Sequence, residues 1–510
     1  MTDPAPQANL FDDENPQGSP KPQTSPNPKL RDVNRQQNVF RCVEIESLIP
    51  EDHEARAIWD FIGRLSLERF FHDIRTFEGE VGRATFSPRV LISVWVYAYC
   101  RGIGSAREVS RLCDFDPAFQ WLTGMNSINH HTLSDFRVDH QDALNQFLVE
   151  VLGILSAEGL ITLKFVAHDG TKIKANASGK SFRREGRLRE HLDAARKQVE
   201  GLNDASAEEV SSRRRRSAEE RVSKLEKALQ ELEKLRKGKK GAEEKAQARV
   251  SETDPEARIM KQGDGGFSPS FNVQVSTDSE SGMIVGVRVT QAGNDHGELV
   301  SAVEEIKKNL GSIPEKMAAD GGYTTHDNIN AMAGMKIDFI GSLPQSANTC
   351  GLKKYGIEPE FHAKAFSYDS ATDTFTCPHG EKLTLSWMGE VNGQKESRYF
   401  APFIACQACP FKVKCCPTNL KTGRSIVRTQ PSPEVAKFKE KMDTDGAKSL
   451  YRRRAPLAEF SNLWIKVKSG LRQFFCRGLE KVTMEVKWVA IATNIRRWIL
   501  QGRLEMEGGG

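Results

Sequence analysis

Two short stretches of this sequence end an apolar run with an aspartate and follow it with glycine. The stretch "KFVAHDGTKIKA" carries Asp169 before Gly170, and "MAADGGYTT" carries Asp320 before Gly321 and Gly322. Either acid alone would be an ordinary turn residue or helix cap. Two aspartates brought close together repel one another unless a positive charge lies between them, and a divalent cation commonly supplies it. Glycine beside each acid would leave room for a metal ion or a phosphate backbone.

Two metal ions about 3.5–4 Å apart can hold both oxygens of a phosphodiester displacement, and this needs a third carboxylate. The segment "LYRRRAPLAEFSNLWIKVKSGLRQF" supplies Glu459. Pro456 suits the first turn of a helix there, and Lys466 falls on nearly the same face as Glu459 two turns along. Tyr451 and the basic run 452–454 add groups that pair with phosphates. The buried stripe of this helix would be Leu457, Phe460, Trp464 and Val467.

The two aspartates are predicted to stand at the ends of strands. A strand over 160–170 would end at Asp169, and a short strand in "PEKMAAD" would end at Asp320. Between them, "FNVQVSTDSESGMIVGVRVTQ" predicts a β-hairpin, and Asp295 is a candidate cap for the helix in "HGELVSAVEEIKKNL". A helix in "TTHDNINAMAGM" and a strand in "IDFIGS" follow. This order predicts an α/β sheet with mixed pairing, in which ligands gather at the carboxyl ends of strands.

Residues 179–255 interrupt this core with a segment of different character. Leucines and other apolar residues recur there at gaps of four and three among Arg, Lys and Glu, which predicts an antiparallel coiled-coil hairpin. The basic runs at 213–216 and 234–240 are either a solvated helix face or a phosphate-contacting arm. The apolar seam would be Leu188, Leu192, Ala195, Val199 and Leu202 in one helix and Val222, Leu225, Leu229, Leu232 and Leu235 in the other.

Residues 343–444 are too many for a simple loop and contain clustered cysteines. Their spacing in "FTCPHGEKL" and "CQACPFKVKCC" resembles half of a zinc ribbon or knuckle with one distant partner. His379 is an alternative ligand, and the alternative to a structural zinc ion is a set of reduced thiols. The candidate zinc ligands are Cys377, Cys406, Cys409 and Cys415.

The N-terminal part of the chain divides into a tail and a helical region. Residues 1–39 are rich in Pro, Asn, Gln and Ser and are predicted to be disordered, and 501–510 form a second tail. Residues 40–158 carry helical apolar spacing, short helices with tight joints and a final long helix beginning near Thr132. This pattern is typical of a helix-turn-helix DNA reader, and a plain helical bundle is the alternative.

Composition places few limits on the partner. Lys and Arg number 73 and Asp and Glu 68, so the net charge of +5 is too small to establish a nucleic-acid partner by itself. No stretch approaches the roughly 20 apolar residues of a membrane span, and no signal peptide is evident. We therefore expect a cytoplasmic protein with no membrane partner, in which the ten cysteines do not form a disulfide framework.

Taken in order, these motifs make the chain resemble the DDE transposases of bacterial insertion sequences, a large group with a ribonuclease-H-like core. The group's first motif, Asp-Gly-Thr before a Lys/Ala/Asn run, matches residues 169–176, and its second, Asp-small-Gly-Tyr, matches 320–323. The N-terminal helices and the tail "GLEKVTMEVKWVAIATNIRRW" are also similar, so the resemblance covers about 42–498. The third motif, Tyr-x2-Arg and then Glu-x6-Lys, matches Tyr451, Arg454, Glu459 and Lys466.

The resemblance implies a chemistry and the residues that perform it. Asp169 would bridge two Mg²⁺ or Mn²⁺ ions, and Asp320 and Glu459 would each hold one. Hydrolysis at the ends of the element would be followed by attack of the freed 3′-hydroxyl on target DNA. Terminal inverted repeats and target DNA would be the partners, and joining two ends favours a homodimer. The predicted DNA-binding residues are Tyr451, Arg454, Lys466, Arg137 and Lys172.

We therefore predict an α/β ribonuclease-H-like core with a mixed sheet over 159–178, 256–342 and 445–500. An N-terminal all-α helix-turn-helix-like domain, the coiled-coil hairpin insertion and the Cys-rich insertion complete the chain. Glu485 is a competing third acid, ranked lower because it lacks a basic neighbour at the motif spacing. Two other functions remain open: a ribonuclease-H-like nuclease without strand transfer, and a catalytically inactive DNA-binding protein derived from a transposase.

Overall fold

The computed structural model describes residue 36 and residues 42–72, 84–204, 211–239, 241–342, 356–391, 394–417, 422–430 and 432–508. The predicted N-terminal tail lies outside these residues apart from residue 36. The chain separates into two units, Met1–Glu44 and Ile45–Gly510, and the helices and strands named here all lie in the second. None of the described helices is both long enough and apolar enough to cross a membrane.

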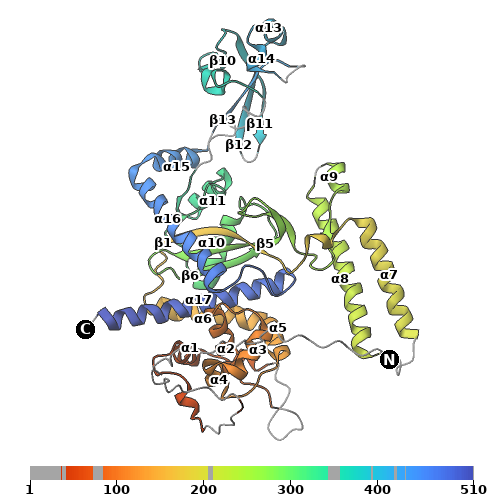
Figure 1. Ribbon diagram of the computed structural model, residues 1–510. Coiled ribbons are helices and arrows are strands. Elements are labelled where there is room, and N and C mark those ends of the chain that lie inside the picture. The colour runs from red at the N-terminus through yellow and green to blue at the C-terminus, as the bar shows by residue number, and fades with distance from the viewer. Residues whose placement is uncertain are drawn as a thin grey trace, which may run out of the picture. The chain divides into compact units, whose positions relative to one another are not determined.

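The N-terminal region is helical, as predicted (Figure 1). Ser87 precedes Pro88 at the start of one helix, and the Ser105 side chain accepts from the backbone N–H of Glu108 to cap the next. The prediction of one long final helix from near Thr132 is wrong, because one helix ends at Asp139 and a second begins at Gln141. The helices are α1 (Glu54–Gly63), α2 (Pro88–Cys100), α3 (Ala106–Phe115), α4 (Pro117–Thr123), α5 (His130–Asp139) and α6 (Gln141–Ala157).

The central sheet has mixed pairing, which confirms that part of the predicted fold. Its strand order is β4-β5-β1-β7-β8, and β6 pairs with β5. The β5 partners β1, β4 and β6 are antiparallel, whereas β1–β7 and β7–β8 are parallel. The strands are β1 (Phe165–Lys174), β4 (Arg258–Lys261), β5 (Phe267–Asp278), β6 (Ile284–Thr290), β7 (Lys316–Ala318) and β8 (Asp338–Ile340).

Helices cover both faces of this sheet. On one face, Ser461 of α16 shares a hydrogen bond of 2.8 Å with Thr277 of β5. On the other, a Cβ at Gly286 of β6 would lie 3.3 Å from Ile306 of α10. Asn494 of α17 also bonds to the backbone of β6. The helices are α10 (Glu298–Leu310), α11 (His326–Gly334), α15 (Pro433–Asp443), α16 (Asp445–Leu463) and α17 (Leu479–Gly508), and α17 includes residues predicted as a tail.

The helix that carries Glu459 differs from the prediction in three ways. Pro456 lies inside α16 and not in its first turn. A π-helix, Trp464–Lys468, follows α16 directly. Val467, predicted to be buried, is 47% exposed. The π-helix adds a residue to each turn and rotates the following positions, so the apolar stripe does not continue to Val467.

Residues 179–255 form two long helices that lie side by side, α7 (Glu185–Asp204) and α8 (Ser212–Lys237), followed by α9 (Ala242–Ala246) (Figure 1). A two-stranded sheet of β2 (Phe182–Arg183) and β3 (Val250–Ser251) closes their base. The buried cluster between the helices includes five of the ten residues predicted for the seam, and Ala228, which was not predicted. Its members are Leu188, Leu192, Ala195, Leu225, Ala228 and Leu232, with Ala248 and Val250 at the base.

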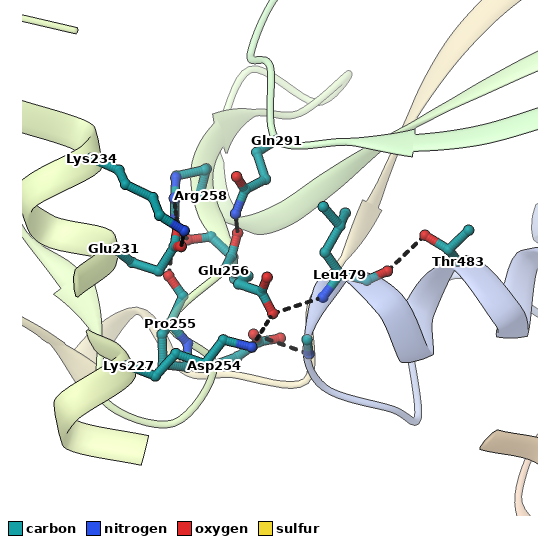
Figure 2. Close-up of polar contacts among 12 residues, drawn as sticks. Lys227, Glu231, Lys234, Asp254, Pro255, Glu256, Arg258, Gln291, Leu479 and Thr483 are labelled. Atoms are coloured by element: carbon teal, nitrogen blue, oxygen red, sulfur yellow. Dashed lines mark hydrogen bonds and ion pairs between the residues drawn. The ribbon is translucent and has the colours of Figure 1, made fainter. Parts of the chain in front are cut away.

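Polar contacts tie this helix pair to the central sheet and to α17 (Figure 2). Glu256, just before β4, accepts from Lys227 of α8 at 2.8 Å and from the backbone N–H of Leu479 at 3.0 Å. Arg258 of β4 donates to Glu231 of α8 at 2.6 Å. One carboxylate therefore stabilises both the helix pair and the first turn of α17, where the helix dipole favours negative charge.

The Cys-rich region contains a second sheet that the sequence did not predict. Its order is β13-β12-β11-β10-β9, and its pairs are all antiparallel. Its buried core is Phe366, Phe375, Leu383, Tyr399, Ala401 and Ile426. The elements are β9 (Ser367–Asp369), β10 (Thr374–Thr376), β11 (Lys382–Val391), β12 (Gln394–Phe400), α13 (Phe403–Ala408), α14 (Lys412–Cys415) and β13 (Ser425–Gln430).

Candidate active site

The parallel pairing of β1 with β7 brings the two predicted aspartates to the same level. The last residue pair of that ladder joins Ala167 to Ala318. Asp169 and Asp320 each lie two residues beyond it, so the same register places them next to one another where β7 has ended. Asp169 is not at the end of its strand as predicted, because β1 continues to Lys174 along β5. The open edge is created by the shortness of β7.

Residues from α16 contact the Asp169 carboxylate. Asn462 donates its side-chain amide to Oδ2 at 3.0 Å, and an Arg454 guanidinium nitrogen lies 4.0 Å from Oδ1. Burial raises the pKa of Asp169 to about 6, an effect that Arg454 opposes and Asp320 reinforces. A bound cation would favour the charged form of this buried carboxylate.

Asp320 begins a tight turn that holds its carboxylate in place. Its Oδ1 accepts from the backbone N–H of Gly322 at 2.7 Å. A Cβ at Gly321 would lie 3.1 Å from the carbonyl oxygen of Ser342, so a small residue is needed there. The space beside Gly170 was predicted to be open for a metal ion or a phosphate backbone, and it is not. A Cβ there would meet Gln274, Asp295 and Tyr323, so protein atoms fill the room expected for a ligand.

Glu459 lies on α16 one turn before Asn462 and is exposed. No contact between Glu459 and either aspartate appears among the described residues. In the same described part of the chain, no three His, Cys, Asp or Glu side chains are grouped closely enough to hold a metal ion. The structure thus brings Asp169 and Asp320 together and leaves Glu459 apart from them.

Two family models match this chain. The model described as "Transposase domain (DUF772)" matches residues 43–139, and the model described as "Transposase DDE domain" matches residues 376–499. The chain belongs to the DDE transposases of insertion-sequence type. The first match covers α1 to α5, and the second covers strands β11 to β13 of the Cys-rich sheet, Glu459 and most of α17. Asp169 and Asp320 lie outside both. Searches of curated proteins and of solved structures gave no match.

Four of the transposase's five predicted DNA-binding residues lie on β1 or on α16 and the π-helix that follows it. Burial lowers the pKa of Lys466, and the charge of Asp169 opposes that shift. Tyr451 packs on a buried cluster of Phe165, Ala318 and Ile340, with Arg454 5.6 Å over its ring. Lys172 is half-buried on β1 beyond the aspartate. Contact of Lys466 and Lys172 with DNA phosphates stays a prediction.

Arg137 is placed differently from the DNA-contacting role predicted for it. It is 4% exposed and donates to the carbonyl oxygen of Gly104 at 2.6 Å and to the Tyr99 hydroxyl at 3.3 Å. Its guanidinium also lies 4.6 Å from the ring centre of Trp95. This placement favours a structural role in the transposase, because the charge is committed to groups inside the helical region.

Glu485, the competing acid, is fully buried on α17 and accepts from the backbone N–H groups of Phe475 and Cys476. Those bonds fix the loop before α17, so Glu485 also has a structural role. This agrees with its lower rank as a third acid.

Sequence reasoning missed the role of Asp295. It was predicted to cap α10, but that cap is Gly297, with no side-chain bond. Asp295 Oδ1 accepts instead from Asn272 at 2.7 Å and from Gln274 at 2.8 Å, both on β5. The available signal was in "FNVQVST", where polar side chains alternate with valine on a strand that is buried on both faces. A buried polar face needs partners, and Asp295 is one of them.

The predicted zinc ligands of the transposase lie around one small cavity of about 30 Å³. Two of their sulfurs accept backbone hydrogen bonds: Cys377 from Glu381 and Cys406 from Arg424, each at 3.3 Å. Burial raises the pKa of Cys415 to about 12, so its thiol is neutral at physiological pH without a metal. The cysteines that line the cavity are Cys377, Cys406, Cys409, Cys415 and Cys416, together with His379.

Proposed function

We propose that this transposase cuts the ends of its DNA element and joins the freed 3′-hydroxyl to target DNA by metal-dependent phosphodiester chemistry. Asp169, Asp320 and Glu459 would be the metal-binding acids. The observation that carries the proposal is the level placement of Asp169 and Asp320 beyond the last β1–β7 pair. The mixed sheet, with antiparallel strands on one side of β1 and parallel strands on the other, supports a ribonuclease-H-like core.

The chemistry of the donors fits Mg²⁺ or Mn²⁺. Carboxylate oxygens are the ligands that these ions prefer, and Asp169 and Asp320 offer two carboxylates at the same level beyond the β1–β7 ladder. When bound, such ions would stabilise charge on the scissile phosphate and activate the attacking oxygen. Asn462 and Arg454 orient the Asp169 carboxylate before any ion arrives.

Glu459 must move toward the two aspartates for this proposal to hold. Pro456 within α16 removes one backbone hydrogen bond of the helix, and the π-helix at Trp464–Lys468 interrupts the regular ladder on the other side. Glu459 lies between these two irregularities. A small rotation of this part of α16, or a new side-chain rotamer, would turn the carboxylate toward the face that carries Asn462.

The DNA-binding part of the proposal depends on cations near the acids. Lys466 would pair with a phosphate beside the cleaved bond, and the exposed Arg452 and Arg453 extend the same positive region along α16. Lys172 is three residues beyond Asp169 on β1 and points to the opposite face of the strand, so it would contact a phosphate away from the cleaved bond. Arg454 is partly committed to Asp169 and would turn to DNA once a metal neutralised that carboxylate. The helix pair of α7 and α8 would be a coiled-coil insertion, and a homodimer would hold two DNA ends together.

The test uses a supercoiled plasmid that carries the element's terminal repeats, with Mg²⁺ and a target plasmid. The wild-type protein should cut at the repeat ends and join them to the target. Asp320→Ala and Glu459→Gln should each abolish both steps, whereas Glu440→Gln, at an exposed acid on α15, should leave them unchanged. Cutting without joining would indicate a nuclease instead. Repeat binding without any cutting would indicate a DNA-binding protein, and unchanged cutting by Asp320→Ala would refute the site.

We also propose a structural zinc ion held by Cys377, Cys406, Cys409 and Cys415. The shared cavity and the two backbone N–H donors to sulfur support it, because such donors stabilise thiolates. The sulfurs must close in around the cavity and lose their protons on binding, so affinity should rise with pH. Zinc would fasten α13 and α14 to the edge of the second sheet, a region whose own buried core is small.

Metal analysis of the purified transposase should find one zinc ion per chain, released when the thiols are modified. Cys409→Ser should lose it, and Cys42→Ser, at an exposed cysteine outside the cavity, should keep it. A metal-free wild-type protein that melts at the same temperature with and without added zinc would contradict the proposal.

A further inference from the structure

The two faces of β1 carry different groups at the aspartate pair. Asp169 is opposite Val275 of β5, and the next residue, Gly170, is opposite Gln274. Successive residues of a strand point to opposite faces of the sheet, so the space beside Gly170 lies behind the Asp169 carboxylate. A Cβ at Gly170 would lie 2.6 Å from Gln274 Nε2, 2.7 Å from Asp295 Oδ1 and 2.7 Å from the Tyr323 hydroxyl. Three separate segments therefore meet behind Asp169.

Hydrogen bonds join these three side chains. Gln274 donates its amide to Asp295 at 2.8 Å, and its carbonyl oxygen accepts from the Tyr323 hydroxyl at 2.5 Å. Asn272 donates to the same Asp295 oxygen at 2.7 Å. His168 lies 2.9 Å from the Gln274 carbonyl oxygen and completes the group. Asp295 thus holds the amide end of Gln274, while Tyr323 and His168 hold its carbonyl end.

Tyr323 connects this network to Asp320. It is fully buried, and its backbone N–H donates to the Asp320 carbonyl oxygen at 3.2 Å, which closes the turn of Asp320, Gly321 and Gly322. A Cβ at Gly322 would lie 3.0 Å from Asp320 Oδ1 and 4.0 Å from the Asp295 Cβ, so Asp295 packs directly beneath the turn. β7 has already ended at Ala318, and no strand ladder holds this turn against β1.

We infer that Asp295 is a positioning residue that, through Gln274 and Tyr323, holds the Asp320 turn level with Asp169. This inference rests on the proposed function, because it concerns the geometry of the proposed metal site. Asp295 supplies two amide hydrogens with an acceptor and packs under the turn. Asp295 lies on the face of β1 opposite to the Asp169 carboxylate. It acts through the side chains of Gln274 and Tyr323 and does not contact the reacting atoms. Displacing one carboxylate by about 1 Å is enough to slow chemistry about 100-fold.

The experiment compares Asp295→Ala and Asp295→Asn with Glu304→Ala, a control at an exposed acid on α10. Asparagine keeps an oxygen that accepts both amide hydrogens, so it should restore what alanine loses. Three readouts are made on the full chain: binding of repeat DNA, the single-turnover cutting rate of bound DNA with Mg²⁺, and hydrogen exchange at the amides of Gly321 to Tyr323. Tyr323→Phe, which removes only the hydroxyl, serves if Asp295→Ala fails to fold.

Asp295→Ala should cut bound DNA at least about tenfold more slowly, bind DNA as tightly as wild type and exchange the turn amides faster. Asp295→Asn should stay within a few-fold of wild type in all three. Equal loss in both variants with unchanged exchange would mean that Asp295 acts through its charge, and would overturn the inference. So would unchanged cutting and exchange in Asp295→Ala. If the wild-type protein cuts nothing, the proposed function fails, but the exchange measurement still decides whether Asp295 holds the turn.

Discussion

Asp169 on β1 and Asp320 just past the end of β7 stand at the same level, each two residues beyond the pair of Ala167 with Ala318. Burial raises the pKa of Asp169 to about 6. At pH 7.5 and without metal, the buried negative charge of Asp169 therefore lowers the free energy of unfolding.

This relationship predicts that Asp169→Asn stabilises the metal-free protein while abolishing cutting. Asparagine keeps an oxygen for Asn462 and removes the buried charge, so the free energy of unfolding at pH 7.5 should rise by about 1–3 kcal/mol. Urea unfolding in EDTA measures it. A lower stability than wild type would mean that the bonds from Asn462 and Gly170 outweigh the cost of the buried charge.

Asp254, which lies outside the candidate active site, should make the stability of the protein depend on pH. It is fully buried between β3 and β4, in the contact group that ties α8 to α17 (Figure 2), and burial raises its pKa to about 6. Because the folded pKa is above the unfolded one, the folded state binds more protons between about pH 4 and 6. The contribution of Asp254 is complete below about pH 4 and is lost as pH rises through 6.

The Asp254→Asn variant should therefore lose less stability than wild type between pH 4 and 7, by up to about 3 kcal/mol. Unfolding free energies of both proteins across this range, taken as differences at each pH, isolate the single group. Asp264→Asn, at an exposed turn aspartate, should track wild type throughout. A constant difference between Asp254→Asn and wild type at every pH would contradict the assignment.

Local patterns predicted much of the central sheet. The hairpin of β5 and β6, the short strand β7 and the helix α11 were predicted because alternation and caps are written into neighbouring residues. The same reasoning placed Asp169 and Asp320 side by side. It failed at the boundary of β1, because β5 continues to pair beyond Asp169 and no local signal encodes a partner that is distant in sequence.

The misplaced residues share one cause. Arg137, Asp295 and Pro456 were assigned roles from their residue type and immediate neighbours: a DNA contact, a helix cap and a first-turn residue. Each is instead governed by tertiary partners, as Arg137 is by Tyr99 and Gly104. Composition along one segment does not reveal which side chains the fold brings into contact, and the second sheet of the Cys-rich region was missed for the same reason.

Arg137→Ala should destabilise the N-terminal helices and not simply weaken DNA binding. The substitution empties a buried site, leaves the Gly104 carbonyl without its donor and removes the positive charge near Glu485, whose pKa burial raises and Arg137 lowers. A loss of about 3–5 kcal/mol in unfolding free energy is expected. Arg107→Ala, at an exposed cation on α3, should change stability by less than about 0.5 kcal/mol. Weaker DNA binding by Arg137→Ala at unchanged stability would restore the original DNA-contact hypothesis.

Alanine substitutions at two glycines test whether the space behind β1 is filled by side chains. Gly170→Ala would push a methyl group into Gln274, Asp295 and Tyr323, all under 3 Å away, whereas a Cβ at Gly153 of α6 has nothing within 4 Å. Gly170→Ala should therefore cost about 1–3 kcal/mol and slow cutting at least tenfold, since the clash displaces the turn that carries Asp320. Gly153→Ala should gain about 0.5–1 kcal/mol, because alanine restricts the unfolded chain and favours the helix. Thermal unfolding and single-turnover cutting of both variants check the pair. Normal cutting by Gly170→Ala would show that the packing behind β1 does not set the position of the acids.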